Sequence, residues 1–265
     1  MSHTEIAGAA GVMIGIAGIS GRMGRLLAEE AAAAGAGLAG GINRSGNAAP
    51  AGAVVFPDIA ALAAASDVVV DFTNASAVMA NAEAIATAGK AWVLGTSGLS
   101  AADEAAVADA ARHVPVVYAA NFAPGVNLVL ALAQKMAAAL PGDQYDAEIV
   151  EMHHRQKVDA PSGTAIGMGR AVAAGRGVRL EDVRESGRDG HVGARKTGAI
   201  GFAALRGGQV VGEHTLLFAS ATEHIALTHR AFDRRAFATG AIRAALWTQG
   251  RAPGLYSMMD VLGMV

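Results

Sequence analysis

Short apolar stretches alternate with longer stretches of mixed polarity along the first half of the chain. The apolar stretches predict buried strands at residues 12–17, 38–42, 67–72, 91–95 and 114–118. The mixed stretches at 21–34, 75–88 and 101–112 predict helices. Strands that alternate with helices indicate an α/β domain with a parallel sheet and right-handed crossovers, which we place at residues 1–123.

The pattern changes after residue 123. Helices are predicted at 126–140 and 162–174, and strands at 145–152, 200–205, 210–219 and 224–228. The charged, glycine-rich segment 175–196 is expected to be a loop, and residues 236–247 predict a last helix. Because consecutive strands joined by turns are typical of α+β structure, we expect a second domain with a mixed sheet at 124–233.

Composition excludes membrane proteins and several kinds of site. The chain has 265 residues, 52% of them hydrophobic, but 63 are alanines that mostly fill the predicted helices. The longest uncharged stretch, 114–134, is interrupted by prolines and asparagines, whereas a membrane span needs ~18 consecutive apolar residues. Residues 1–5 lack the positively charged region of a secretory signal, so we expect a cytoplasmic protein that does not enter membranes.

Charge and cysteine content narrow the function further. A net charge of −2 gives no sign of a nucleic-acid-binding surface. The absence of cysteine excludes disulfides, thiolate nucleophiles and cysteine-bound zinc.

A glycine-rich turn follows the first predicted strand and opens the first predicted helix. Its glycines are Gly18, Gly21 and Gly24, in the pattern G-x-x-G-x-x-G. In this position a glycine turn brings backbone N–H groups and a helix N-terminus close to a pyrophosphate. We therefore expect a Rossmann-type domain that binds a dinucleotide. The alternative is a purely structural turn in a chain with 34 glycines.

Two residues at the end of the second strand bear on the choice of cofactor. Asn43 lies 19 residues after Gly24, where such folds often carry an acid that bonds the adenosine ribose. Arg44, the next residue, is suited to pairing with a 2′-phosphate. We therefore expect NADPH to be used at least as well as NADH, although an ordinary loop would also account for these residues.

Two further turns follow predicted strands, one from Gly95 to Gly98 and one from Ala119 to Phe122. Either could be a plain turn. Because ligands bind at the carboxyl ends of strands in open parallel sheets, these two turns and the glycine turn are expected to form one rim.

The segment 151–165 concentrates chemistry that the rest of the chain lacks. It contains the adjacent His153 and His154, then Lys157, and it ends at Ser162, which is suited to capping a helix. A histidine can act as a general acid near neutral pH, and the start of a helix can hold a carboxylate. We expect an anionic substrate with more than one carboxylate here. A solvated loop is the alternative, and the spacing does not favour a metal site.

The chain closely resembles the dihydrodipicolinate reductases over nearly its whole length. The resemblance rests most on Glu151-x-His153-His154-x-x-Lys157-x-Asp159-Ala160-Pro161-Ser162-Gly163-Thr164-Ala165, and also on the glycine turn, Asp71-Phe72-Thr73, Gly95-Thr96-Ser97-Gly98, Ala119-Ala120-Asn121-Phe122, Gly198-x-Ile200-Gly201-Phe202 and Gly212-Glu213-His214-Thr215. The long histidine-containing motif is highly specific, and the glycine turn alone is much less so.

The resemblance implies a function and a role for each matching residue. It implies hydride transfer from NADPH or NADH to a cyclic, unsaturated imine dicarboxylate formed by loss of water from 4-hydroxy-tetrahydrodipicolinate, in lysine and diaminopimelate biosynthesis. His153 would donate the proton with Lys157 as its partner, while His154, Gly163 and Thr164 would bind the substrate. The implied cofactor contacts are Gly18, Ile19, Ser20, Gly21, Arg22, Met23, Asn43, Arg44, Gly95, Thr96, Ser97, Ala119, Ala120, Asn121 and Phe122.

The resemblance also implies a homotetramer joined through the second domain's sheet and a C-terminal helix, within residues 234–265, that returns to the first domain.

One alternative function is another nicotinamide enzyme, such as a semialdehyde dehydrogenase, but that usually needs the cysteine that this chain lacks. A second alternative is a non-catalytic NAD(P)-binding sensor. His153, Lys157 and Thr164 argue against it.

Overall fold

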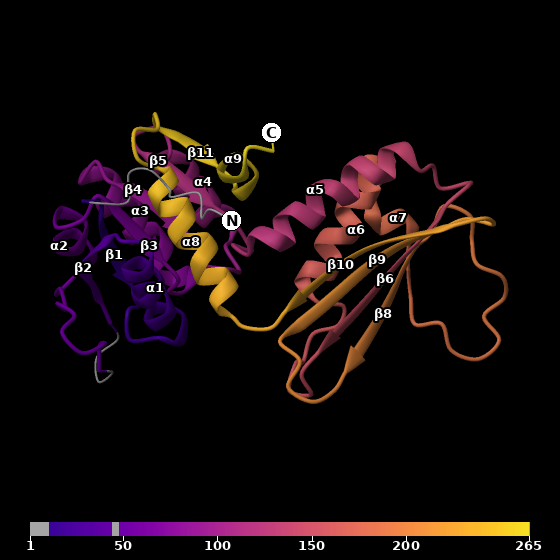
Figure 1. Cartoon of the computed structure of the whole chain (residues 1–265). Coiled ribbons are helices and arrows are strands. Elements are labelled where there is room, and N and C mark those ends of the chain that lie inside the picture. Colours follow the sequence, from indigo (N-terminus) through magenta and orange to yellow (C-terminus); the bar gives the residue numbers. More distant parts are fainter. Residues whose placement is uncertain (1–10, 44–47, 265) are drawn as a thin grey trace, which may run out of the picture. The chain divides into compact units, whose positions relative to one another are not determined.

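A computed structural model describes residues 11–43 and 48–264 (Figure 1). The chain forms two compact units, the first of Met1–Pro124 with Arg235–Val265 and the second of Gly125–Arg234. The second unit is therefore inserted into the sequence of the first. Among the described residues, no helix is long and apolar enough to cross a membrane.

The first unit contains a six-stranded sheet. From edge to edge its strands are β2 (Gly37–Ile42), β1 (Met13–Ala17), β3 (Val68–Asp71), β4 (Ala91–Leu94), β5 (Pro115–Tyr118) and β11 (Gly254–Tyr256). All neighbouring strands run parallel. This confirms the predicted Rossmann-type sheet, whose strand order reverses between β1 and β3.

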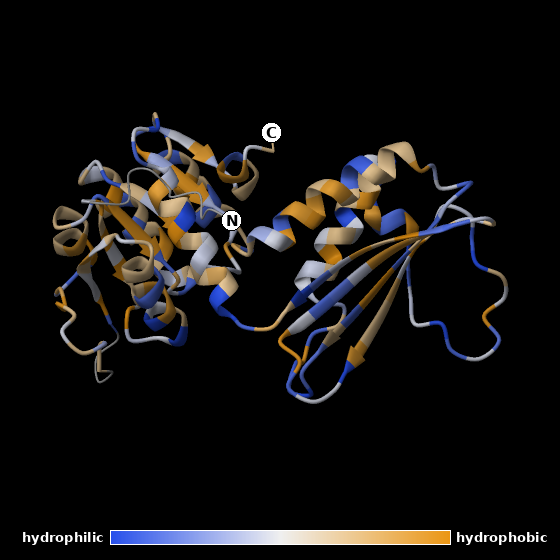
Figure 2. Cartoon of the chain, viewed as in Figure 1, coloured by the Kyte–Doolittle hydropathy of each residue, from blue (hydrophilic) through white to orange (hydrophobic). Residues whose placement is uncertain are grey.

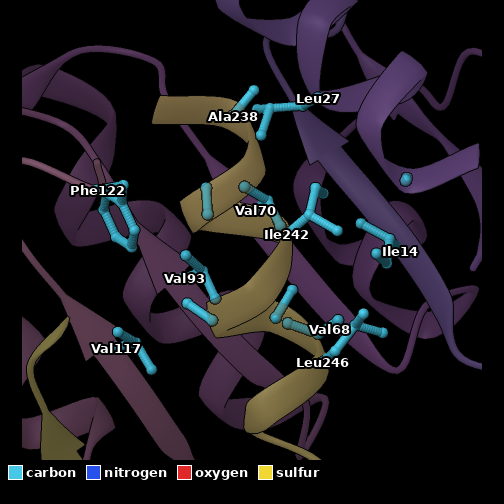
Figure 3. Close-up of a cluster of buried hydrophobic side chains, with 14 of the residues drawn as sticks. Ile14, Leu27, Val68, Val70, Val93, Val117, Phe122, Ala238, Ile242 and Leu246 are labelled. Carbon is cyan, nitrogen blue, oxygen red and sulfur yellow. The ribbon is translucent and has the colours of Figure 1, made fainter. Parts of the chain in front are cut away.

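Helices cover both faces of this sheet. Helices α1 (Arg22–Ala33) and α8 (Arg235–Trp247) pack on one face, and α2 (Ile59–Ala64), α3 (Ala75–Thr87) and α4 (Ala101–Ala110) pack on the other. Within β3, Val68 and Val70 point to the face that α1 and α8 cover and belong to the same buried cluster as Ile242 of α8 (Figure 3). Val69 belongs to the buried cluster on the other face, beneath α2, α3 and α4. Burial on both faces explains why these strands are continuous apolar runs.

The C-terminal part of the first unit contains more than the expected helix. After α8 ends at Trp247, the chain adds β11 to the edge of the sheet next to β5 and then forms α9 (Met258–Leu262). A three-residue strand is too short to show a period in the sequence, which is why only the helix is predicted there.

The second unit contains a five-stranded mixed sheet in the order β10 (His224–Ala231), β9 (Gly212–Ala219), β6 (Asp146–His153), β8 (Ile200–Arg206) and β7 (Arg184–Ser186). The central strand β6 is parallel to β8 and antiparallel to β9. This arrangement confirms the expected α+β domain with a mixed sheet.

One face of the second sheet carries the core of its unit. Residues of α5 (Pro124–Ala139) and α6 (Gly163–Gly175) pack on buried strand residues such as Ile149 and Phe218. Buried and less buried positions alternate along β6 and β9, and the buried positions of β6 change from Ala147 and Ile149 to the polar Glu151 and His153. Figure 2 shows both hydrophobic and hydrophilic residues along the strands of this sheet. The opposite face carries apolar side chains that remain exposed, among them Val150 and Leu205.

The segment 175–196 is not the featureless loop that its composition predicts. It contains α7 (Leu180–Val183) and β7, and β7 adds an edge strand to the second sheet beside β8. The prediction is wrong because these elements are short and charged, so that neither shows an apolar period. Pairing with β8 holds β7 in place, and burial of Leu180 in the core holds α7 in place.

Candidate functional site

The glycine-rich turn joins β1 to α1 in the first unit. Gly18 has a φ of 85°, which residues with a side chain rarely adopt. A Cβ at Gly24 would lie 2.2 Å from the carbonyl oxygen of Gly18 and 2.7 Å from the Cα of Ile19. The turn therefore needs glycine at both positions for the chain to enter α1 tightly.

The structure shows which N–H groups of this turn are already used. Those of Gly18 and Ile19 both donate to the carbonyl oxygen of Ile42, at 2.9 and 3.0 Å. The first N–H groups of a helix have no acceptor within that helix. Donors for an anion are therefore expected mainly from the start of α1, at Arg22 and Met23.

A cleft of about 430 Å³ opens beside the turn. Residues at the carboxyl ends of three neighbouring strands line it, among them Gly21 after β1, Asn43 after β2 and Thr73 after β3. This is the point where the strand order reverses, which is where open α/β sheets bind their ligands. The predicted residue Arg44 lies outside the described residues.

Asp71, at the end of β3, is fully buried next to this cleft. Its carboxylate accepts hydrogen bonds from the N–H of Thr73 at 3.0 Å, from the Thr73 hydroxyl at 2.6 Å and from the Asn81 amide at 2.8 Å. Asp71 therefore fixes the backbone that forms one wall of the cleft.

The turns after β4 and β5 are linked through two aromatic rings. A Cβ at Gly95 would lie 2.3 Å from the ring of Phe72, and that ring packs on Phe122 with 5.5 Å between centroids. The buried Thr96 hydroxyl has no hydrogen-bond partner among the described residues. An unsatisfied buried hydroxyl is costly, so its place on this rim fits a polar ligand.

In the second unit, His153 ends strand β6 and is only 8% exposed. Glu151 lies two residues earlier on the same face of the strand and is 1% exposed. Its Oε2 atom lies 2.6 Å from His153 Nδ1. Arg206 of β8 binds the same carboxylate through both terminal nitrogens, at 2.8 and 2.9 Å.

The ion pair decides the charge of this buried carboxylate. Burial alone would raise the pKa of Glu151, but hydrogen bonds from Arg206 and His153 outweigh it and hold the pKa below its usual value. The same contact raises the pKa of Arg206. Glu151 is therefore a carboxylate at neutral pH.

Lys157, which the resemblance implies as the partner of His153, contacts Asp159 in this structure. Its Nζ atom donates to Asp159 Oδ1 at 2.8 Å, and its backbone N–H donates to the carbonyl oxygen of His154 at 3.1 Å. The partner of His153 Nδ1 is Glu151. His154 and Lys157 nevertheless lie in one tight turn directly after β6, which ends at His153.

Helix α6 begins next to this turn. Ser162 caps it, because its Oγ atom accepts the N–H of Ala165 at 3.2 Å. The Ser162 hydroxyl also lies 2.9 Å from Nε2 of His214 on β9. A Cβ at Gly163 would meet nothing within 4 Å, so the space beside the helix start is open. The partial positive charge of a helix N-terminus favours a carboxylate here.

Three further side chains contact the predicted residues, Glu151, His214 and Arg206. Glu151 and His214 lie in stretches that carry the resemblance but have no role assigned from the sequence, and Arg206 lies in none of these stretches. Glu151 could have been found, because residues two apart in a strand share a face. Arg206 and His214 reach the site only through pairing of β8 and β9 with β6. Among the described residues, no group of three or more histidine or acidic side chains could hold a metal ion.

Comparisons with known proteins identify the family. The family model "Dihydrodipicolinate reductase, N-terminus" matches residues 12–122, and "Dihydrodipicolinate reductase, C-terminus" matches residues 125–262. The 4-hydroxy-tetrahydrodipicolinate reductase of Granulibacter bethesdensis is 73% identical, over 96% of this chain and 97% of its own. That of Acidiphilium cryptum is 62% identical, over 96% and 99%.

A solved structure shares the fold. Dipicolinate-bound dihydrodipicolinate reductase from Paenisporosarcina sp. TG-14 superposes with a TM-score of 0.76 at 23% identity, covering 94% of this chain and 98% of its own. The matches to both family models and the high identity to the two relatives together decide the identity. The chain belongs to the dihydrodipicolinate reductases, the NAD(P)H-dependent oxidoreductases of lysine and diaminopimelate biosynthesis that reduce dehydrated 4-hydroxy-tetrahydrodipicolinate to tetrahydrodipicolinate.

Proposed function

We propose that His153 is the proton donor of this reduction, with Lys157 as its partner. One observation carries the proposal: a single carboxylate, that of Glu151, accepts from both His153 Nδ1, at 2.6 Å, and the N–H of Ser162, at 3.1 Å. The proton donor and the start of α6 are therefore neighbours. An anion bound at the helix start lies close to the imidazole ring.

His154, Gly163 and Thr164 are assigned to the substrate's carboxylates. The open space beside Gly163 and the dipole of α6 support this assignment. The Paenisporosarcina protein is dipicolinate-bound, and dipicolinate is a cyclic dicarboxylate. His153 then donates its proton to the carbon next to the one that has been reduced.

The cofactor is assigned to the cleft of the first unit and to the rim beside it. NAD(P)H, when bound, supplies the hydride. The glycine turn lines the cleft through Gly18, Ser20 and Gly21, directly before the start of α1, and Thr96 offers its unpaired buried hydroxyl. The assigned residues are Gly18, Ile19, Ser20, Gly21, Arg22, Met23, Asn43, Arg44, Gly95, Thr96, Ser97, Ala119, Ala120, Asn121 and Phe122.

The proton-donor assignment is tested with His153→Gln. Removing a positioned general acid lowers kcat by roughly 10²–10⁴-fold, and we expect a loss in that range with cofactor binding unchanged. The assay supplies the product of the preceding synthase and follows NAD(P)H absorbance. His113→Gln, a change at an exposed histidine after α4, is the matched control and should keep full activity.

Full turnover in His153→Gln would remove His153 as the donor. Absence of any cofactor oxidation by the native chain, with cofactor still bound, would instead favour the non-catalytic sensor.

NADPH is proposed to serve at least as well as NADH. Asn43 lines the cleft and, unlike an acid, does not repel a 2′-phosphate, and Arg44 follows it directly. We expect kcat/KM for NADPH to equal or exceed that for NADH, and to fall selectively for NADPH in Arg44→Ala. A strong preference for NADH that Arg44→Ala leaves unchanged would contradict this proposal.

A homotetramer joined through the second sheet is also proposed. The support is the exposed apolar character of the face opposite α5 and α6, where Leu205 is 52% exposed. Light scattering after gel filtration should give four times the chain mass, and Leu205→Glu should reduce it.

The remaining assignments concern the domains and the location. Residues 1–123 with 234–265 are proposed as the dinucleotide-binding domain, and 124–233 as the domain for substrate binding and oligomerisation. The protein is proposed to act in the cytoplasm, which fractionation of cells that express the chain would test.

A further inference from the structure

A buried polar cluster surrounds the proposed proton donor in the second unit. We define the Glu151 cluster as Glu151 and His153 on β6, Arg206 on β8, His214 on β9 and Ser162 at the start of α6. The proposed function uses His153 and leaves the other four side chains without a role. All five lie on the helix-facing side of the sheet, and Glu151 and Ser162 are 1% and 2% exposed.

Glu151 makes four contacts at its two oxygens. Oε2 lies 2.6 Å from His153 Nδ1 and accepts from Arg206 Nη1 at 2.8 Å. Oε1 accepts from Arg206 Nη2 at 2.9 Å and from the N–H of Ser162 at 3.1 Å. A carboxylate that is paired with an arginine can only accept hydrogen bonds. The shared proton between Glu151 and His153 therefore resides on Nδ1.

This contact determines which nitrogen of His153 can take part in the reaction. With Nδ1 donating to Glu151, the proton that His153 transfers is the one on Nε2 of the doubly protonated ring, and the transfer leaves the neutral Nδ1–H form. The edge of the His153 ring packs on His214, with 5.0 Å between centroids and 74° between planes, which restrains its rotation. A Cβ at position 212 would lie 3.0 Å from Nε2, so Gly212 leaves room beside this atom.

His214 supports the same arrangement as a neutral residue. Burial, followed by the nearby His153, lowers the pKa of His214 to about 4. At neutral pH it therefore adds no positive charge next to His153. Its Nε2 atom lies 2.9 Å from the Ser162 hydroxyl, so it contacts both the proposed donor and the helix start.

We propose that Glu151 is a positioning residue that holds His153 as the Nδ1–H form and fixes its distance from the carboxylate-binding start of α6. Arg206 supports Glu151 by keeping its carboxylate ionised. It also holds the segment before α6 in place, because it donates a hydrogen bond to the carbonyl oxygen of Asp159 at 2.7 Å. The inference rests on the proposed function, because Glu151 acts through His153.

The test replaces the carboxylate with an amide of the same shape in Glu151→Gln. Because an amide can either donate or accept, it no longer fixes the proton on Nδ1. We expect kcat to fall by up to roughly 10⁴-fold, as for the loss of a carboxylate that orients a catalytic histidine, with KM for the cofactor unchanged. Glu148→Gln is the matched control, since Glu148 lies on β6 with its side chain toward the other face and also pairs with arginines.

A spectroscopic signature separates positioning from a merely structural role. The ¹⁵N signals of the His153 ring, assigned by their loss in His153→Gln, are recorded on the cofactor-free protein. We expect the neutral ring to be the Nδ1–H tautomer in the native chain and in Glu148→Gln. In Glu151→Gln the Nε2–H tautomer should become substantial.

Glu151→Gln leaves the Arg206 charge unpaired and could unfold the unit. The double variant Glu151→Gln with Arg206→Met removes both charges and should show the same tautomer change and loss of kcat. Native kcat and an unchanged tautomer in a folded variant would overturn the inference, even if His153→Gln is inactive. Full turnover in His153→Gln would overturn the donor assignment, and the role of Glu151 in catalysis with it.

Discussion

The two sheets of this reductase differ in the number of faces that helices cover and in the polarity of the buried side chains. In the first unit both faces of the sheet are apolar except for the buried Asp71 at the end of β3, and the turns at the carboxyl ends of its strands line the cleft. In the second unit one buried face begins apolar and ends, along β6, in Glu151 and His153. Where helices cover both faces of a sheet, a ligand can reach mainly the backbone at the strand ends. Where helices cover one face only, charged side chains on the strands can be reached as well.

The comparison makes glycine important for different reasons in the two units. In the first, Gly24 has no room for a side chain because the backbone of its own turn fills the space. In the second, the space next to Gly163 is open. A methyl group added at each position therefore distinguishes a steric requirement of the fold from a requirement of ligand binding.

The largest effect is expected for Gly24→Ala. The new Cβ would lie 2.2 Å from the Gly18 carbonyl oxygen, and only backbone movement could relieve that contact. We expect a loss of about 3 kcal/mol or more in the free energy of unfolding, together with loss of NAD(P)H binding. Thermal unfolding and titration with NADPH measure the two effects. Native stability in this variant would show that the turn adapts.

An intermediate effect is expected on lowering the pH, and it should be concentrated in the second unit. The folded pKa of His214, about 4, lies below the ordinary value of 6.5, so the unfolded chain binds a proton first as the pH falls. The stabilisation is complete above pH 6.5 and is lost between pH 6.5 and 4, a change of about 3 kcal/mol at most. His214→Gln should weaken this pH dependence.

The two units can be followed separately during such an acid titration. Both tryptophans, Trp92 and Trp247, belong to the first unit, so their fluorescence reports its unfolding. Amide hydrogen exchange in β6 and β9 reports on the second. Loss of protection in both units at the same pH would show that their stabilities are coupled.

The smallest effect on stability is expected for Gly163→Ala. Alanine is compatible with the first turn of a helix and meets no neighbour here, so the free energy of unfolding should change by less than about 1 kcal/mol. If a carboxylate approaches this backbone, the added methyl group should raise KM for the substrate. An unchanged KM would move the carboxylate site away from Gly163.

The sequence predicts most elements of both sheets because their apolar runs and periodic patterns can be recognised without knowledge of the tertiary structure. It misses α2, α7, β7, β11 and α9, which are all short, and β7 and β11 depend on pairing with strands that are distant in the chain. The glycine turn and the histidine motif are local and can be read directly. Arg206 cannot, because 55 residues separate it from Glu151 and only the parallel pairing of β6 with β8 brings them together.

Gly95 shows a further limit of reading motifs. Its place after β4 in a ligand-binding fold suggests that it makes room for a cofactor, yet a Cβ there would first meet the Phe72 ring, at 2.3 Å. The sequence identifies the position, and only the packing reveals that the fold itself already demands glycine.

The insertion of the second unit has a consequence for synthesis on the ribosome. Helix α8 covers the face of the first sheet that includes Ile14, Val70 and Val93, but it is translated only after the whole of Gly125–Arg234. At about 5–20 residues per second, that delay is roughly 5–20 s. During this time the nascent first unit exposes an apolar sheet face, so it is a natural client for a chaperone until Arg235–Trp247 emerges from the exit tunnel.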